Sequence, residues 1–210
     1  MRYPSLGEHA KRAFDFTVAL VMLLVCLPVM AVVALAVGVT MGRPILFRQQ
    51  RPGCAARPFT LLKFRTMIVS KSSLIDPSTD AARLTKIGIL LRRASLDELP
   101  QLWNVLKGEM SLIGPRPLLM EYLPLYTDEQ AERHRVRPGL TGLAQVNGRN
   151  AIAWEQKLQL DTWYVRHWSF GLDLRILLVT MGKVLRREGI SHRGHVTMEK
   201  FGKKFGAEPR

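Results

Sequence analysis

The chain has 210 residues, of which 47% are hydrophobic and 23% are charged, so it is neither a disordered chain nor a polytopic membrane protein. Lys and Arg number 31 against 17 Asp and Glu, and this excess favours a partner that carries phosphate: nucleic acid, anionic lipid or a phosphorylated substrate. The length predicts one compact domain at residues 43–210 behind an anchor at residues 1–42.

A run without any charged residue extends from Phe16 to Thr40 and predicts a membrane anchor. A straight helix of this length would cover roughly 37 Å, which is enough to cross a bilayer. Pro28 lies inside the run, where a proline bends or breaks a helix, and basic residues flank the run on both sides. Because positive flanks stay cytoplasmic, a re-entrant helix broken at Pro28 explains these features about as well as a straight span.

Two short strands at residues 45–49 and 59–66 flank a loop with Pro and Gly, and they predict a small β-hairpin. The two-residue period of a strand puts Lys63 and Arg65 on one face, which suits either an anionic ligand or solvent. Residues 81–94 predict an amphipathic helix with a basic face. Such a helix lies either in a membrane interface or against a protein core, and its pattern does not decide between them.

Two adjacent carboxylates, Asp97 and Glu98, follow in a chain that is otherwise short of acid. We expect Asp97 to be the N-cap of a helix that has Pro100 in its first turn and ends at Gly108. A helix N-terminus keeps a carboxylate ionised and also favours phosphate. The pair is therefore either a helix cap with a first-turn acid or a pair of catalytic groups.

The segment 111–117, with sequence SLIGPRP, holds Arg116 between two prolines that fix the backbone. A rigid backbone that presents one arginine suits the recognition of an anion. Residues 127–135 predict a short helix that opens with a capping box. Residues 137–150 contain three glycines without a helical period, and they predict a shaped binding loop that contains Arg149.

Two further helices are predicted at residues 151–168 and 172–187, so the expected fold class is α+β and mostly helical. Asp161 and Tyr164 share one face of the first of these helices because they are three residues apart.

An acidic pair and several constrained cations are the chemically informative residues, since the sequence shows no Ser–His–Asp order, Cys nucleophile or zinc spacing. The cations are Lys63, Arg92, Arg116 and Arg149. Phosphoryl transfer needs cations for phosphate oxygens, a carboxylate for a divalent metal, and a nucleophile, which can itself be a carboxylate. Mg²⁺ is the expected ion because it takes few protein carboxylates and completes its shell with water and phosphate.

Ordered motifs cover nearly the whole chain. They are KRAFD at 11–15, KFRTM at 63–67, SLDELPQ at 95–101, SLIGPRP at 111–117, RPGLTG at 137–142 and QVNGRN at 145–150. In these motifs the sequence resembles the monotopic phosphoglycosyl transferases, the bacterial sugar transferases that start glycoconjugate assembly. The short chain is similar to the minimal form of that family.

The resemblance implies a two-step transfer of a sugar 1-phosphate from a UDP-sugar to a polyprenyl phosphate such as undecaprenyl phosphate. Asp97 attacks the β-phosphate and releases UMP, and the lipid phosphate then attacks the sugar-phosphoryl aspartate. Glu98 either moves a proton or orients the lipid phosphate, and Mg²⁺ binds at Asp97 and the diphosphate. The expected phosphate- and substrate-binding residues are Lys63, Arg65, Arg92, Arg116, Arg149, Asp161 and Tyr164.

The resemblance also implies a re-entrant membrane helix broken at Pro28, interfacial amphipathic helices and a catalytic domain on the cytoplasmic face of the bacterial inner membrane. Many members have Ser before this proline, whereas this chain has Leu27, so the sharpness of the break stays open. The tail at residues 194–201 resembles members that act on N-acetylated sugars such as UDP-diacetylbacillosamine. We expect membrane lipids and no nucleic acid as partners, and a homodimer stays open.

A non-enzymatic membrane-anchored protein that binds nucleic acid or anionic lipid is the alternative. It predicts cations spread along an exposed helix or stripe with interleaved aromatic residues. The cations of this chain are instead held by prolines and glycines around an acidic pair, and this favours the transferase.

Overall fold

The structure, a computed structural model, describes residues 6–68, 83–148, 152–186 and 201. Most of these residues lie in helices and a few in two small sheets, which confirms the α+β class. The helices are α1 (Leu6–Met41), α3 (Lys86–Arg93), α4 (Gln101–Lys107), α5 (Asp128–Ala131), α6 (Leu143–Val146), α7 (Trp154–Arg166) and α8 (Phe170–Arg186). The strands are β1 (Leu46–Pro52), β2 (Pro58–Phe64), β3 (Ser111–Ile113) and β4 (Gly139–Thr141).

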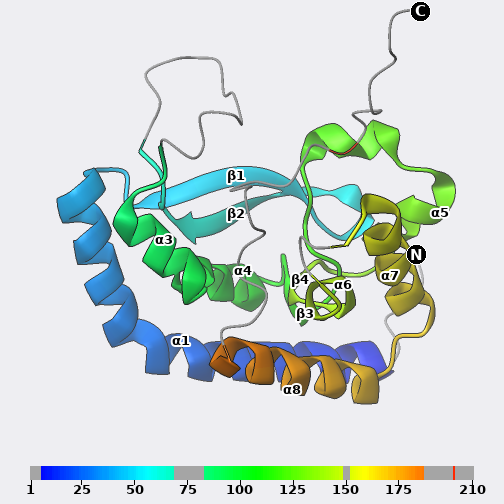
Figure 1. The fold of residues 1–210 in the computed structure, drawn as a ribbon. Helices are drawn as coiled ribbons and strands as arrows, with labels where there is room; N and C mark the ends of the chain where they lie inside the picture. Colours follow the sequence, from blue (N-terminus) through cyan, green and yellow to red (C-terminus); the bar gives the residue numbers. More distant parts are fainter. Residues whose placement is uncertain (1–5, 69–82, 149–151, 187–200, 202–210) are drawn as a thin grey trace, which may run out of the picture.

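Helix α1 contains Pro28 but is continuous from Leu6 to Met41, so the proline does not end it. Figure 1 shows α1 running along one side of the molecule and then turning up an adjacent side, a bend that a proline explains. Among the described residues, α1 is the one helix that is long and apolar enough to cross a membrane. Only 11% of its most apolar 18-residue stretch is buried. The core helix of a soluble protein would be mostly buried, so the exposed apolar surface of α1 suits lipid.

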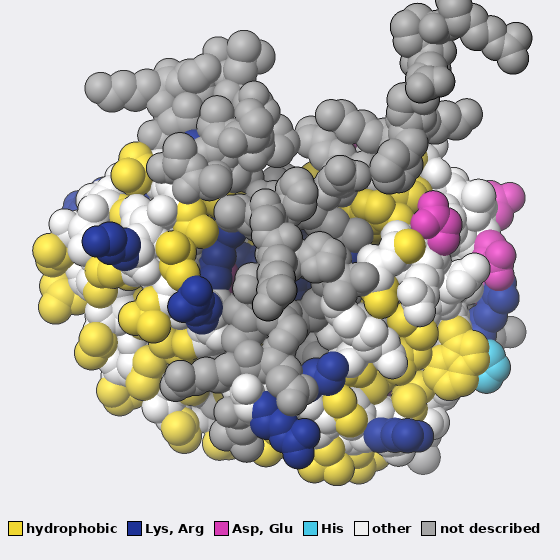
Figure 2. Space-filling model, viewed as in Figure 1, with side chains coloured by type: hydrophobic (Ala, Val, Ile, Leu, Met, Phe, Trp, Pro, Cys, Tyr) yellow, Lys and Arg dark blue, Asp and Glu magenta, His cyan; other side chains and the backbone are white. Residues whose placement is uncertain are grey.

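Helix α8 adds to this apolar surface. Apolar side chains gather along the left and lower edges of the molecule in Figure 2, where Figure 1 places α1 and α8. Val39 of α1 is 77% exposed and Leu178 of α8 is 68% exposed. Helix α8 confirms the helix predicted at residues 172–187 as far as Arg186, and its exposed side chains are mainly apolar.

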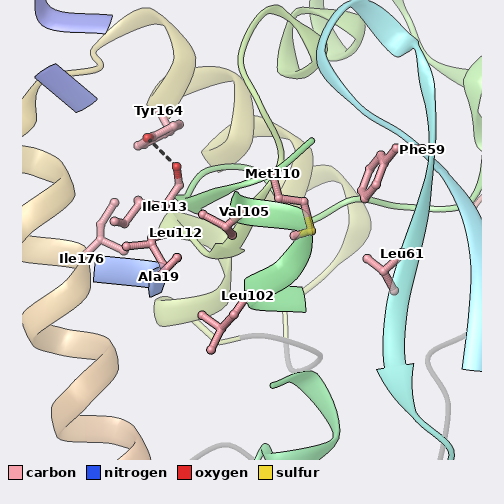
Figure 3. Packing of buried hydrophobic residues seen from close by; sticks show 10 residues of the cluster. All are labelled: Ala19, Phe59, Leu61, Leu102, Val105, Met110, Leu112, Ile113, Tyr164 and Ile176. Atoms are coloured by element: carbon pink, nitrogen blue, oxygen red, sulfur yellow. Dashed lines mark hydrogen bonds between the residues drawn. The ribbon is translucent and has the colours of Figure 1, made fainter. Parts of the chain in front are cut away.

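The main core joins α1, β2, α4, β3, α7 and α8 through ten buried side chains, which Figure 3 labels. The predicted hairpin is confirmed, because β1 and β2 pair antiparallel with Phe47 opposite Lys63. Asn104 of α4 binds the hairpin through two hydrogen bonds. Its side chain accepts from Leu62 N at 3.2 Å and donates to Thr60 O at 2.8 Å. Strand β2 is therefore held in register against α4.

Strand β4 lies inside the segment that the sequence predicts as a binding loop, residues 137–150, and it pairs in parallel with β3. Ser111 pairs with Gly139, and the two backbones are so close that a Cβ on Gly139 would lie 2.1 Å from Gly114 N. A Cβ on Gly142 would lie 2.1 Å from Gly114 O. The described part of residues 137–150 therefore contains β4 and α6, and Gly139 and Gly142 serve backbone packing, so the prediction of a loop is wrong over these two elements.

Two helix starts show how local sequence sets the boundaries. Helix α3 begins at Lys86, later than predicted, because Thr85 is its N-cap and accepts from Gly88 N at 2.9 Å. Leu91 of α3 is buried in a second core cluster, whereas its neighbour Leu90 is 63% exposed. The predicted capping box at Thr127 is confirmed, and α5 continues from there into a 3₁₀ helix (Glu132–Arg135).

Candidate active site

Asp97 and Glu98 lie in one 3₁₀ turn, Leu96–Glu98, between α3 and α4. Ser95 has a left-handed backbone with φ 55°, which turns the chain sharply after α3. Helix α4 begins only at Gln101, so Asp97 is not its N-cap and that prediction is wrong.

The backbone explains why Asp97 caps nothing. An N-cap aspartate accepts from the N–H groups two and three residues later. Here Leu99 N donates to Leu96 O at 3.4 Å, and Pro100 has no N–H. The carboxylate is therefore left available, while the predicted end of α4 at Gly108, with φ 82°, is confirmed.

Glu98 accepts from two cations on one oxygen. Lys63 Nζ lies 2.7 Å and Arg116 Nη2 lies 2.6 Å from Glu98 Oε1. Burial alone would raise the pKa of Glu98, but the charges and hydrogen bonds of Arg116 and Lys63 hold this pKa well below its usual range. Glu98 is therefore a fixed anion that joins β2 to the segment after β3.

Asp97 is 8% exposed, and its carboxylate forms no hydrogen bond with any residue that the structure describes. Burial, followed by the negative charge of Glu98, raises the pKa of Asp97, while the charges of Lys63, Arg92 and Arg116 oppose that rise. A carboxylate with a raised pKa and cations close by is a strong candidate for a nucleophile towards phosphorus.

We call Lys63, Arg92, Asp97, Glu98 and Arg116 the carboxylate–cation cluster. The side chain of Arg116 is 44% exposed, so Arg116 can contact a ligand while it also binds Glu98. Arg92 Nε donates to Thr66 Oγ1 at 3.1 Å, which anchors this arginine at the end of α3. Figure 2 shows Lys and Arg side chains set back from the surface left of the centre of the view.

Three predicted substrate-binding residues lie outside the carboxylate–cation cluster, and Arg149 lies outside the described residues. Strand β2 ends at Phe64, so the two-residue period does not extend to Arg65. Arg65 is 5% exposed, and its side chain donates to the carbonyl oxygens of Met41 and Gly42, the latter at 2.7 Å. Arg65 therefore caps the C-terminal end of α1.

Asp161 and Tyr164 share a buried face of α7, as predicted, but they contact protein groups. Asp161 Oδ2 accepts from Arg133 Nη2 at 2.7 Å. Tyr164 OH lies 2.7 Å from Asp173 Oδ1 and 3.2 Å from Ile113 O, a contact drawn in Figure 3. No spacing or composition signal in the sequence indicates Arg133, because its partner Asp161 is 28 residues away.

Comparison with known proteins shows the family to which the chain belongs. Residues 6–187 match the family model described as bacterial sugar transferase. A relative from Bacillus subtilis, named uncharacterized sugar transferase EpsL, is 57% identical over 192 residues, which cover 91% of this chain and 95% of the relative.

Two longer relatives carry more specific names. The UDP-galactose-lipid carrier transferase of Erwinia amylovora is 40% identical over 88% of this chain and 43% of the relative. The undecaprenyl-phosphate galactose phosphotransferase of Salmonella typhimurium is 38% identical over 87% of this chain and 42% of the relative. This chain thus spans about two-fifths of these two proteins. It belongs to the bacterial sugar transferase family.

Proposed function

We propose that this protein transfers a sugar 1-phosphate from a UDP-sugar to polyprenyl phosphate, through a covalent sugar-phosphoryl aspartate at Asp97. The available, buried carboxylate of Asp97 beside a Glu98 that two cations hold in place is the observation that carries this proposal. The names of the relatives, which include undecaprenyl-phosphate galactose and glucose phosphotransferases, support the same reaction. They also favour it over the alternative of a non-enzymatic binder.

In the first step, an oxygen of Asp97 attacks the β-phosphorus of the UDP-sugar. The bond between this phosphorus and the bridging oxygen breaks, and UMP leaves with the electron pair. Lys63, Arg92 and Arg116 neutralise the phosphate oxygens, which reduces the repulsion between the carboxylate and the diphosphate. Their charges act at a site of low exposure, where electrostatic stabilisation is strongest.

In the second step, an oxygen of polyprenyl phosphate attacks the same phosphorus. The bond to Asp97 breaks, the carboxylate is regenerated, and the product is a polyprenyl-diphosphate-sugar. Glu98 orients the cations in both steps. We do not assign it the role of a base, because Arg116 and Lys63 occupy its Oε1 and hold its pKa well below the usual range.

The residues present fit Mg²⁺, with the Asp97 carboxylate as its protein ligand. The described residues contain no group of three or more His, Cys, Asp or Glu side chains that could enclose a metal. Mg²⁺ does not need one, since it binds through one or two carboxylates plus phosphate oxygens and water. Asp97, whose carboxylate has no hydrogen-bond partner among the described residues, would supply that carboxylate, and a bound Mg²⁺ would neutralise charge on the diphosphate.

The apolar surface of α1 and α8 is proposed to lie in the bacterial inner membrane, with the active site on the cytoplasmic side. A bend at Pro28 allows both ends of α1 to lie on the cytoplasmic side of the membrane, and the basic residues on both flanks favour this arrangement. Labelling of tagged termini in spheroplasts tests it: we expect the N-terminus and the catalytic domain on the same side. Termini on opposite sides would contradict a re-entrant helix.

UMP release from a panel of UDP-sugars, with undecaprenyl phosphate and Mg²⁺, tests the reaction. We expect turnover by the wild type and none by Asp97→Asn, with Glu129→Gln, which is 65% exposed, as a control that retains activity. Radiolabelled UDP-sugar without the lipid acceptor should leave label on the wild-type protein and none on Asp97→Asn. Equal turnover by the two proteins would disprove the aspartate intermediate.

We propose an N-acetylated sugar as the preferred substrate, on the resemblance of the C-terminal tail alone. The names of the relatives specify galactose and glucose for those proteins, so both UDP-sugars belong in the panel beside UDP-diacetylbacillosamine. A clear preference for UDP-glucose or UDP-galactose would contradict this part of the proposal and leave the reaction type unaffected.

A further inference from the structure

Asp161 of α7 forms a buried ion pair that does not touch the carboxylates of the active site. Arg133 donates to Asp161 Oδ2 from Nη2 at 2.7 Å and from Nε at 3.2 Å, and the two side chains are 1% and 2% exposed. Burying two charges costs several kcal/mol per ion in desolvation, so such a pair is weak evidence for stability. A role in geometry, which an apolar pair could not perform, explains it better.

The guanidinium of Arg133 reaches the backbone of the active site. Arg133 Nη2 also donates to Arg116 O at 2.7 Å, and Nη1 lies 3.4 Å from Tyr126 OH. All three guanidinium nitrogens of Arg133 therefore have protein partners, and these bonds use four of its five N–H groups.

The backbone of Pro115, Arg116 and Pro117 is held at each carbonyl. Pro115 O accepts from Gly139 N at 2.9 Å, Arg116 O accepts from Arg133, and Pro117 O accepts from Arg51 Nη1 at 3.4 Å. The donors at the two ends come from β4 and β1. The donor to Arg116 O is Arg133, and it alone among these three donors also binds α7, through Asp161.

Arg116 links the Arg133–Asp161 ion pair to the carboxylate–cation cluster. Its backbone is fixed by Arg133, and its side chain donates to Glu98 Oε1 at 2.6 Å, directly beside Asp97 in the same turn. A displacement of the Arg116 backbone would therefore move the guanidinium relative to both Glu98 and a bound phosphate.

We propose that Arg133 and Asp161 are positioning residues, which fix Arg116 for phosphoryl transfer and make α7 a support of the active site. The proposal rests on the function proposed above. It explains the choice of arginine, because the planar guanidinium holds Asp161 through both Nε and Nη2 while Nη2 also donates to Arg116 O, whereas a lysine has one nitrogen in place of this rigid fork. A misplacement of about 1 Å in such a site costs on the order of 10²-fold in rate.

Arg133→Lys tests the proposal, because it keeps the charge beside Asp161 and removes the fork. In the full-length protein in nanodiscs, we expect kcat to fall by on the order of 10²-fold, with a smaller change in the KM for the UDP-sugar. Asp173→Asn is the matched control, since it removes another buried carboxylate from an ion pair, at 2.6 Å to the partly buried Lys11, that does not contact Arg116. It should lower the melting temperature as much as Arg133→Lys does and leave kcat within about twofold.

A double-mutant cycle separates positioning from general destabilisation. In the background Arg116→Gln, Arg133→Lys should have little further effect on kcat, because the guanidinium that it positions is already absent. Equal fold-losses in both backgrounds would overturn the proposal. So would a loss of kcat in Asp173→Asn equal to that in Arg133→Lys.

A spectroscopic readout keeps the inference separate from the reaction. The ¹⁵N–¹H signal of the Arg116 side chain, identified by its absence in Arg116→Lys, should shift and broaden in Arg133→Lys and stay unchanged in Asp173→Asn. If the wild type turns over no UDP-sugar, the proposed function fails, yet this signal still decides whether Arg133 fixes Arg116. An unchanged signal in Arg133→Lys would overturn the inference even in an active enzyme.

Discussion

Asp97 and Glu98 are neighbours in one turn, yet their surroundings shift the two pKa values in opposite directions. Burial and the charge of Glu98 raise the pKa of Asp97. Burial acts in the same sense on Glu98, but Arg116 and Lys63 outweigh it and lower that pKa. Two carboxylates whose environments separate their pKa values have separate roles. Asp97 is suited to attack, and Glu98 is suited to hold cations.

Glu98→Gln should move the acid limb of the pH–rate profile to lower pH. Activity needs the carboxylate form of Asp97, so it is present above the raised pKa of Asp97 and is lost as the pH falls through it. Removing the charge of Glu98 removes one cause of that rise, while Lys63, Arg92 and Arg116 continue to lower the pKa. At the optimum pH, kcat should fall on the order of 10²-fold because Lys63 and Arg116 lose their shared anchor.

Profiles of kcat/KM against pH for the wild type and Glu98→Gln measure this shift, with Glu129→Gln as a surface control whose profile should match the wild type. An acid limb that moved to higher pH would contradict the assignment of Glu98 as the charge that raises the pKa of Asp97.

Asp97→Asn should stabilise the protein at neutral pH although it abolishes activity. The folded-state pKa of Asp97 is raised, so the folded protein binds more protons than the unfolded chain between the two pKa values. Stability therefore falls as the pH rises through that window, and a neutral side chain avoids the loss. We expect a gain of about 1 kcal/mol, or about 2–4 °C in melting temperature for a chain of this length.

Thermal unfolding in detergent at pH 7 with EDTA measures this effect without a metal contribution. The difference between Asp97→Asn and the wild type should shrink towards acid pH, where Asp97 is protonated in both states. A lower melting temperature for Asp97→Asn at pH 7 would show that the nearby cations outweigh burial.

The sequence predicts local features of this site better than its long-range geometry. The hairpin, the capping box at Thr127 and the helix end at Gly108 are confirmed because each depends on a few neighbouring residues. The parallel pairing of Ser111 with Gly139 depends on residues far apart in the chain, so a glycine-rich stretch looks irregular. In the same way, no pattern connects Arg133 with Asp161.

Arg65 shows where the two-residue period of a strand gives a wrong prediction. Its alternation with Lys63 predicts a shared anion-binding face, but the strand ends at Phe64 and Arg65 caps α1 instead. We expect Arg65→Met to lower the free energy of unfolding by about 1.5–3 kcal/mol, because the carbonyl oxygens of Met41 and Gly42 lose a charged donor. The KM for the UDP-sugar should stay unchanged in the folded fraction.

Lys63→Met provides the comparison for Arg65→Met. It should raise that KM or lower kcat with a smaller change in melting temperature, because Lys63 is 22% exposed and contacts Glu98. A raised KM in Arg65→Met at an unchanged melting temperature would instead place Arg65 at the phosphate.

The close approach of Gly139 to Gly114 should be intolerant of a single methyl group. In Gly139→Ala, the new Cβ would lie 2.1 Å from Gly114 N and 2.3 Å from Thr141 O, so β3 and β4 must separate. Their separation also removes the Gly139 N–H bond to Pro115 O, one residue before Arg116. We expect a loss of about 3 kcal/mol or more in stability, together with reduced kcat in the protein that still folds.

Gly182→Ala is the matched control for this change, because a Cβ there meets nothing within 4 Å and the residue lies inside α8. Alanine has the higher helix propensity, so this variant should gain up to about 1 kcal/mol and keep wild-type kcat. Melting temperatures and UMP release for the two variants test the pair together. Wild-type stability in Gly139→Ala would show that the β3–β4 backbones can separate freely, and that Arg116 does not depend on their contact.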